Sequence, residues 1–129
     1  MRIVGIGIDA VEIERVERLY ERFPVAFFER VFTPLERRYC LSRKRNFGES
    51  LAARWAAKEA ALKALGTGWS SGVSWTDVEV ENNESGAPVL NFYGGARDVA
   101  SRLGVVDAKI SISHCKTLAF AYVTLSAED

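Results

Sequence analysis

Hydrophobic residues near the start of the chain alternate with glycine and predict a short strand. Val4, Ile6 and Ile8 fall on one face under period-two alternation, and the two intervening glycines leave the other face nearly bare. A bare strand face lets another backbone or a ligand approach closely. We expect the strand to end at Asp9, because the hydrophobic period changes after this residue.

Helical periodicity follows this strand. Apolar residues recur at three- and four-residue steps from Ile13 to Phe23, which predicts a helix that Pro24 ends. A second helix is predicted to begin at Thr33, because a proline follows at the first helical position and Glu36 completes a capping box.

The longest predicted helix runs from Glu49 to Leu65, after a capping pattern that starts at Asn46. Its sequence, ESLAARWAAKEAALKAL, is rich in strong helix formers, and Gly66 supplies the stop.

Strand patterns dominate the second half of the chain. The segments VEVEN and PVLNF flank the turn NNESGAP, and AKISIS and LAFAYVTL form another hairpin pattern around residues 114–117. Between the hairpins, residues 96–103 predict a short helix that a glycine closes. Because hairpins outnumber long crossovers, we expect an α+β fold with a mainly antiparallel sheet packed by one long and several shorter helices.

Composition places the chain among globular proteins and restricts its partners. Its 129 residues fit one domain, residues 1–129, and 48% of them are hydrophobic. Lys plus Arg and Asp plus Glu number 17 each, so no overall charge favours nucleic acid. The two cysteines lack metal-site spacing, and no segment resembles a signal peptide or a membrane span. We therefore expect a reduced, cytoplasmic protein that binds neither nucleic acid nor membrane.

Two patterns compete to explain Asp9. With Glu12 three residues later it matches a capping box, in which its carboxylate would simply begin the next helix. The glycines and Ala10 also match the dinucleotide fingerprint G-x-G-x-x-A. We reject dinucleotide binding, because no clear buried strand follows the helix and the glycines lie within the strand rather than in a loop.

A second acid, Glu59, makes metal binding the alternative to capping. It is flanked by alanines in the longest helix, one turn from Trp55 and one turn from Lys63. If this thinly covered face docks on the glycine face of the first strand, the carboxylates of Asp9 and Glu59 come together. Two carboxylates at one site repel unless a cation joins them, and oxygen ligands suit Mg²⁺. The simpler alternative is a surface ion pair between Glu59 and Lys63.

Four blocks of the sequence resemble a known family. In chain order they are GIGIDAVEIERV, FTPLERRYC, LAARWAAKEAALKALGTG and SISHCKTLAFAYV, and they span nearly the whole chain. They resemble the signature blocks of the bacterial holo-acyl-carrier-protein synthases, the small class of 4′-phosphopantetheinyl transferases. The block W-A-A-K-E-A-x-x-K-A-L is the most specific of them.

This resemblance implies a reaction and its catalytic residues. Family members transfer the phosphopantetheine arm of coenzyme A to a serine of apo acyl carrier protein, release adenosine 3′,5′-bisphosphate and support fatty acid biosynthesis. Asp9 and Glu59 match the two protein ligands of Mg²⁺, and Lys63 matches a catalytic lysine that meets coenzyme A phosphates. The larger transferases carry another acid where this chain has Val11, so the resemblance implies a water in that coordination position. Either Glu59 or a metal-held water accepts the serine proton.

The resemblance also implies how coenzyme A is bound and how the chain assembles. Arg54, Lys63, Gly66 and His114 are the implied contacts. His114, the only histidine, is either a turn residue at a hairpin tip or a group that reaches coenzyme A from an adjacent subunit. Gly66 and Gly68 either bring backbone N–H groups to the ligand or simply end the long helix. Because family members form trimers with active sites at subunit boundaries, a homotrimer is implied.

Basic residues are candidates for contact with the acidic carrier protein. Arg15, Arg18 and Arg22 form a stripe on the predicted helix that follows the first strand. By resemblance Arg15 is the first candidate for carrier contact, with Arg22 on the same stripe. The alternative is a solvated face on which Glu14 pairs with Arg18. The cluster RKR at 43–45 is a candidate for the adenosine 3′-phosphate.

The alternative to an enzyme is a small oligomeric binding module, in which Asp9 caps a helix and Glu59 pairs with Lys63. The sequence does not choose between a fatty acid and a polyketide carrier, nor does it define the tolerance for acyl-coenzyme A.

Overall fold

Strands and helices are interspersed along the chain, and the computed structural model describes residues 1–67 and 72–129 of it. The elements in chain order are β1 (Arg2–Glu12), α1 (Ile13–Arg22), a π-helical segment (Pro24–Glu29), α2 (Pro34–Ser42), a 3₁₀ turn (Lys44–Asn46), α3 (Phe47–Leu65), a second 3₁₀ turn (Trp75–Asp77), β2 (Val78–Asn82), β3 (Pro88–Phe92), α4 (Gly94–Leu103), β4 (Val105–His114) and β5 (Leu118–Ala127).

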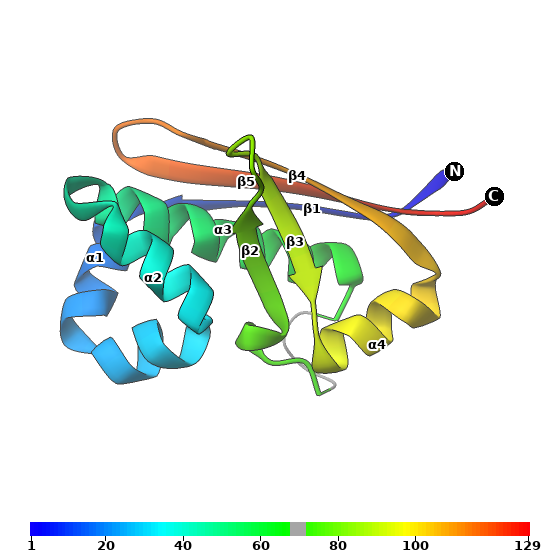
Figure 1. Ribbon diagram of the computed structural model, residues 1–129, viewed down its shortest axis with the longest axis horizontal. Coiled ribbons are helices and arrows are strands. Elements are labelled where there is room, and N and C mark those ends of the chain that lie inside the picture. The colour runs from blue at the N-terminus through cyan, green and yellow to red at the C-terminus, as the bar shows by residue number, and fades with distance from the viewer. Residues whose placement is uncertain (68–71) are drawn as a thin grey trace.

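The strands form two antiparallel sheets. β5 lies between β1 and β4 in a three-stranded sheet, and β2 pairs with β3 in a separate hairpin. Figure 1 shows the three-stranded sheet as one long layer with α3 running along it, and the β2–β3 hairpin crossing α3. The expected α+β fold with a mainly antiparallel sheet is confirmed.

The first strand is longer than the sequence pattern predicts. β1 continues through Asp9 to Glu12, and α1 begins at Ile13 without a side-chain capping hydrogen bond. The predicted capping box of Asp9 and Glu12 is therefore wrong. Pairing with β5 explains the difference, because Asp9 lies opposite Ala121 and Glu12 lies opposite Leu118 in the sheet.

The other predicted helix ends are partly confirmed. The backbone N–H of Glu36 donates to Thr33 Oγ1 at 3.3 Å and that of Thr33 donates to Glu36 Oε1 at 2.8 Å, which completes the predicted capping box of α2. α3 begins at Phe47, and Asn46 makes no side-chain capping bond, so this predicted cap is wrong. Gly66 ends α3 in the left-handed conformation, with φ +80°.

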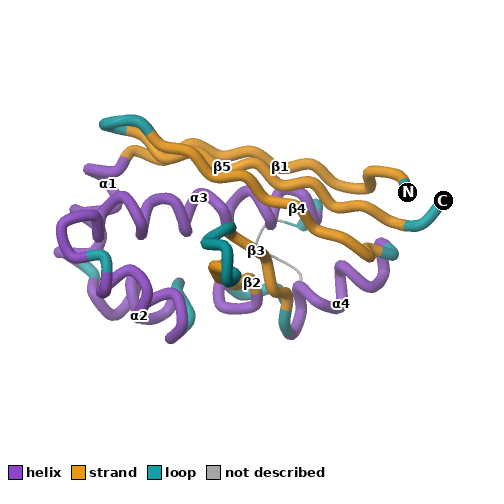
Figure 2. Tube along the Cα trace, turned by 45° about the horizontal axis from the view of Figure 1, so that its top comes forward, coloured by secondary structure: helices purple, strands orange, loops and turns teal. Residues whose placement is uncertain are grey.

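The core lies between α3 and one face of the three-stranded sheet. Most side chains of α3 are buried, including its alanines, and Val123 and Leu125 of β5 are buried against it. The opposite face of the sheet is exposed and apolar, and Figure 2 shows no described element over it. Its large exposed side chains are Ile3, Ile6, Ile8, Phe120 and Tyr122.

None of the helices in residues 1–67 and 72–129 has the length and apolar character that crossing a membrane requires.

Candidate active site

The glycine face of β1 lies directly on α3. A Cβ atom placed on Gly7 would overlap the backbone carbonyl of Ala60, and one placed on Gly5 would overlap that of Ala64. Glycine is therefore required on the strand, and the buried alanines keep the helix surface equally thin. The expected docking of the long helix on the glycine face is confirmed.

This contact brings Asp9 and Glu59 to one site. Asp9 lies on the glycine-bearing face of β1, and Glu59 lies on the part of α3 that contacts this face. Burial raises the pKa of Glu59, and the negative charge of Asp9 raises it further. The positive charges of Lys63 and Arg15 oppose this shift and offset it only in part. The two carboxylates thus repel each other across the strand–helix contact.

Lys63 pairs with Asp9 rather than with Glu59. Its Nζ lies 3.1 Å from Asp9 Oδ1 and also donates to the backbone carbonyl of Ile8 at 3.0 Å. The predicted surface pair of Glu59 and Lys63 is therefore not the one that forms. Because Asp9 does not cap a helix either, both features of the binding-module alternative are missing.

Arg15 of α1 reaches the same site through an aromatic contact. Its guanidinium lies over the indole ring of Trp55, 5.3 Å from the ring centroid. Arg18 pairs instead with Glu14, with an Nη1–Oε1 distance of 3.2 Å, and both side chains are exposed. This ion pair confirms, for Arg18 alone, the alternative in which the helix face is solvated and Glu14 pairs with Arg18. Arg22 is exposed in the last turn of α1.

The donor set of this site fits Mg²⁺. Asp9 and Glu59 would supply two hard carboxylate ligands, and Lys63 and Arg15 offset their mutual repulsion only in part. No group of three or more His, Cys, Asp or Glu side chains that could hold a metal occurs in the described part of the chain. The other coordination positions would thus fall to water and phosphate oxygens. Val11 is buried, and its side chain offers no oxygen ligand.

A second group of polar side chains surrounds a cavity near the first turns of α3. The cavity has a volume of about 370 Å³, and Arg54 is the cation most deeply set in its wall. The Arg54 guanidinium lies 3.9 Å from the ring centroid of Tyr39 and donates to Asn82 Oδ1. Its side chain is buried, and its Nε makes no hydrogen bond with the described residues. Such an unpaired buried donor is unfavourable, which makes this cavity a candidate binding site.

His114 lies on the wall of the same cavity. It is the last residue of β4 and directly precedes the turn at residues 115–117, so its contact with coenzyme A stays a prediction. Its Nε2 lies 3.9 Å from Glu49 Oε2 at the start of α3. From the predicted basic cluster, Arg43 also lines this cavity, whereas Lys44 and Arg45 lie in a neighbouring hollow with it.

Gly66 has a demonstrated structural role. Its backbone N–H donates to the carbonyl oxygens of Leu62 and Lys63, both at 3.1 Å, which ends the helix. Its contact with coenzyme A stays a prediction. Gly68, the other glycine of this motif, lies outside the described residues.

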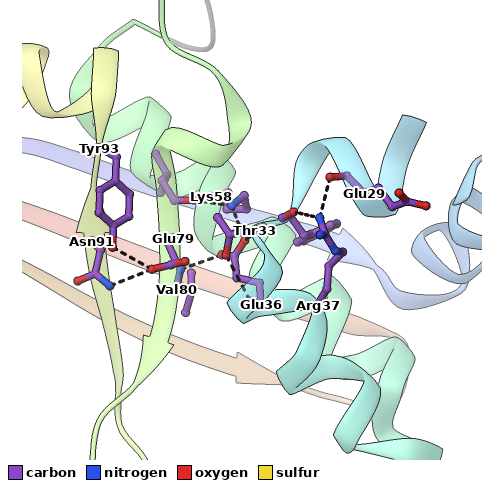
Figure 3. A network of polar contacts seen from close by, with 11 residues as sticks. Glu29, Thr33, Glu36, Arg37, Lys58, Glu79, Val80, Asn91 and Tyr93 are labelled. Carbon is purple, nitrogen blue, oxygen red and sulfur yellow. Dashed lines mark hydrogen bonds and ion pairs between the residues drawn. The ribbon is translucent and has the colours of Figure 1, made fainter. Parts of the chain in front are cut away.

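One buried ion pair was missed by the sequence analysis. Lys58 Nζ lies 2.7 Å from Glu36 Oε1, and both side chains are fully buried. Glu36 Oε2 accepts the backbone N–H of Val80 at 2.8 Å, and Lys58 also donates to the carbonyl of Val78, so the pair joins α2, α3 and β2 (Figure 3). The available signal was Lys58 directly after two alanines in an alanine-rich helix.

Fold and site together define a class of transferase. A family model described as the 4′-phosphopantetheinyl transferase superfamily matches residues 5–123. The chain therefore belongs to the 4′-phosphopantetheinyl transferase superfamily, and the expected family is confirmed.

Sequence and structural relatives narrow this class. The chain is 46% identical over 123 residues to the holo-[acyl-carrier-protein] synthase of Solibacter usitatus. The matched region covers 95% of this chain and 98% of the relative. The holo-(acyl-carrier-protein) synthase of Bacillus anthracis, solved in complex with CoA (3′,5′-ADP), is 38% identical. The two folds match with a TM-score of 0.80 over 98% of each chain. The Helicobacter pylori holo-[acyl-carrier-protein] synthase, solved in complex with coenzyme A, is 30% identical, with a TM-score of 0.80 over 94% of this chain and 99% of that one. The expected enzyme class, a 4′-phosphopantetheinyl transferase of the holo-acyl-carrier-protein synthase type, is confirmed.

Proposed function

We propose that this chain transfers the 4′-phosphopantetheine moiety of coenzyme A to a serine hydroxyl of apo acyl carrier protein. The reaction depends on Mg²⁺, releases adenosine 3′,5′-bisphosphate and serves fatty acid biosynthesis in the cytoplasm. The observation that carries this proposal is the meeting of Asp9, Glu59 and Lys63 across the glycine–alanine contact of β1 and α3.

The residues of this site suit phosphoryl transfer. The serine oxygen forms a bond to the phosphorus that bears pantetheine, and the bond from this phosphorus to the bridging oxygen of the nucleotide breaks. Glu59, or a water beside it, accepts the serine proton. Lys63 places a positive charge where negative charge develops on the departing phosphate. When bound by Asp9 and Glu59, Mg²⁺ would neutralise further charge on the pyrophosphate.

The nucleotide part of coenzyme A belongs in the cavity of Arg54 and His114. Arg54 offers an unpaired, buried N–H, which a phosphate oxygen satisfies well. Tyr39 and Asn82 hold its guanidinium in place. Arg43 adds a second cation to the cavity wall for the adenosine 3′-phosphate.

We further propose that the active site is completed between the subunits of a homotrimer. Arg54 contacts α2 and β2, whereas Glu59 faces β1. The two residues are five positions apart in α3, so their side chains point about 140° apart around the helix axis. The two parts of the site thus lie on different sides of α3 within one chain. The exposed apolar sheet face that contains Ile8 and Tyr122 supports association with further copies. A ring of copies would bring the Arg54 cavity of one chain to the Asp9 site of the next.

The carrier protein approaches beside α1. Arg15 and Arg22 are exposed on this helix, and Arg15 is fixed over Trp55 close to Glu59. Arg15 beside the reacting groups and Arg22 further along the same helix suit an acidic partner that must deliver a serine.

Mass spectrometry of the carrier protein tests this function. The full chain is incubated with coenzyme A, Mg²⁺ and apo acyl carrier protein, and we expect a carrier that gains one phosphopantetheine. Asp9→Asn should keep the fold, because Asp9 lies in a strand ladder, yet lower the rate about 100-fold or more. Failure to modify several apo carriers would contradict the proposal, and full activity of Asp9→Asn would remove Asp9 from the site.

A further inference from the structure

The ammonium of Lys63 occupies one of the two carboxylate oxygens through which Asp9 would hold a metal ion. Lys63 Nζ lies 3.1 Å from Asp9 Oδ1, and its second acceptor is the carbonyl of Ile8 at 3.0 Å. A carboxylate coordinates Mg²⁺ at about 2.1 Å, so an ammonium on the same oxygen would lie against the bound ion. Two cations this close repel strongly.

Lys63 is also able to leave Asp9. Its side chain is 54% exposed, whereas that of Asp9 is 19% exposed, so Asp9 is fixed in the strand while the lysine extends into solvent from α3. A lysine has a flexible four-carbon stem and a point charge that pairs with many acceptors. An exposed ion pair of this kind is weak, typically contributing less than about 1 kcal/mol.

We propose that Lys63 is an exchangeable counter-ion of Asp9, which neutralises the carboxylate when the metal is absent and moves to the phosphates of coenzyme A when both ligands are bound. This inference rests on the proposed function, because it concerns the same metal and the same substrate. Lys63 therefore competes with the metal at Asp9 until phosphate oxygens draw it away. The metal and coenzyme A then favour each other's binding, and by thermodynamic reciprocity each raises the affinity for the other by the same factor.

Metal binding in the absence of coenzyme A tests this competition without an activity assay. Mn²⁺ is a suitable probe, since it shares the oxygen ligands of Mg²⁺, and its affinity is measured by water proton relaxation on the full chain. We expect Lys63→Met to bind Mn²⁺ about threefold more tightly than the unaltered protein, because the competing cation is gone. Lys63→Arg keeps the charge and should bind with unaltered affinity.

Matched variants distinguish direct competition between Lys63 and the metal at Asp9 from a general effect of nearby positive charge. Arg15 also places a positive charge near Glu59, but its guanidinium lies over the Trp55 ring, so Arg15→Met should raise the affinity less than Lys63→Met does. Coenzyme A should tighten Mn²⁺ binding by a larger factor in the unaltered protein than in Lys63→Met. Asp9→Asn should lose Mn²⁺ binding in every condition.

The outcomes distinguish this inference from the proposed function. Unchanged or weaker Mn²⁺ binding by Lys63→Met, with Asp9→Asn still defective, overturns the exchange and leaves the transferase site intact. An equal gain in Arg15→Met also overturns it, because distance alone would then explain the effect. Absence of Mn²⁺ binding by all the proteins, even with coenzyme A, contradicts both the exchange and the metal site on which it rests.

Discussion

Lys58 and Glu36 form a fully buried ion pair, with 2.7 Å between Nζ and Oε1. Burial lowers the pKa of Lys58, and the charge of Glu36 together with its hydrogen bond opposes this shift. Glu36 also accepts backbone N–H groups from Thr33 and Val80, so the pair ties the start of α2 to β2 through α3. Lys58 directly precedes Glu59, so this tie fixes the rotation of α3 at the active site.

Removal of one partner of this pair should destabilise the protein far more than removal of both. Lys58→Met or Glu36→Leu leaves a buried charge without a partner, and we expect either to cost about 3–5 kcal/mol of unfolding free energy. The double variant carries no buried charge and should recover most of this loss. Urea unfolding of the four proteins measures the effect.

If the double variant loses as much unfolding free energy as the two single variants together, this account of the ion pair is wrong. Arg18→Met, which removes an exposed ion pair with Glu14 in α1, is the control and should change stability by less than about 0.5 kcal/mol.

The glycine at position 7 should tolerate no side chain. Gly7→Ala places a Cβ against the carbonyl of Ala60, and a backbone atom cannot move aside alone, so β1 and α3 must separate. We expect a loss of about 1–3 kcal/mol and a fall in activity, because Asp9 moves away from Glu59. Chemical unfolding and the carrier-modification assay measure the two effects.

The matched control adds one atom on the exposed face of the same strand. Ala10→Ser should leave the unfolding free energy within about 0.5 kcal/mol of the unaltered protein, since Ala10 is exposed. If Gly7→Ala is equally harmless, the glycine is not needed for the strand–helix contact.

Much of the contact between β1 and α3 could be predicted from the sequence, because its physical basis is local. Alternating glycines in a strand and alanines beside Glu59 in a helix mark two thin surfaces, whatever lies between them in the chain. The end of β1 could not be predicted in this way. The residues after Asp9 have the spacing of a helix start, and only the pairing of this segment with β5, more than 100 residues later, keeps it extended through Glu12.

The sequence pattern also could not predict which side chains pair when they come from distant parts of the chain. Glu36 was identified as a capping residue, and this is correct, but its second carboxylate oxygen and Lys58 depend on how α2, α3 and β2 meet. The choice of Lys63 between Glu59 and Asp9 is of the same kind. Helical spacing alone favours Glu59, whereas the docked strand supplies a nearer carboxylate.

The two cysteines should differ sharply in reactivity. Hydrogen bonding to the backbone of Thr117 and Leu118 lowers the pKa of Cys115, which is exposed. Burial raises the pKa of Cys40 to about 12. Because the thiolate is the reactive form, Cys115 should react with a chromogenic disulfide at about pH 7, faster than an ordinary thiol. Cys40 should react only on unfolding.

The pH dependence has a definite sign for each thiol. The labelling rate of Cys115 should reach half its maximum below the ordinary cysteine pKa of about 8.5. For Cys40 the folded-state pKa lies above the unfolded one, so its contribution to stability is present below about pH 9 and is lost as the pH rises towards 12. Cys115→Ser and Cys40→Ser assign the rates, and fast labelling of the Cys115→Ser protein in its folded state would contradict the burial of Cys40.

Mixed assemblies of two inactive variants should regain activity if the site is shared between subunits. Asp9→Asn disables the carboxylate side of the site and Arg54→Gln disables the cavity side, so each variant alone should be nearly inactive. When the two are co-expressed in equal amounts with different tags, one of the three sites in each mixed ring combines an intact Asp9 with an intact Arg54 of the neighbour. We expect the purified mixture to regain activity in this proportion. Asp9→Asn mixed with Glu59→Gln is the control, because both changes lie on the same side of the site and no pairing restores it. Mixed assemblies that carry both tags but show no more activity than this control would place the complete site within one chain.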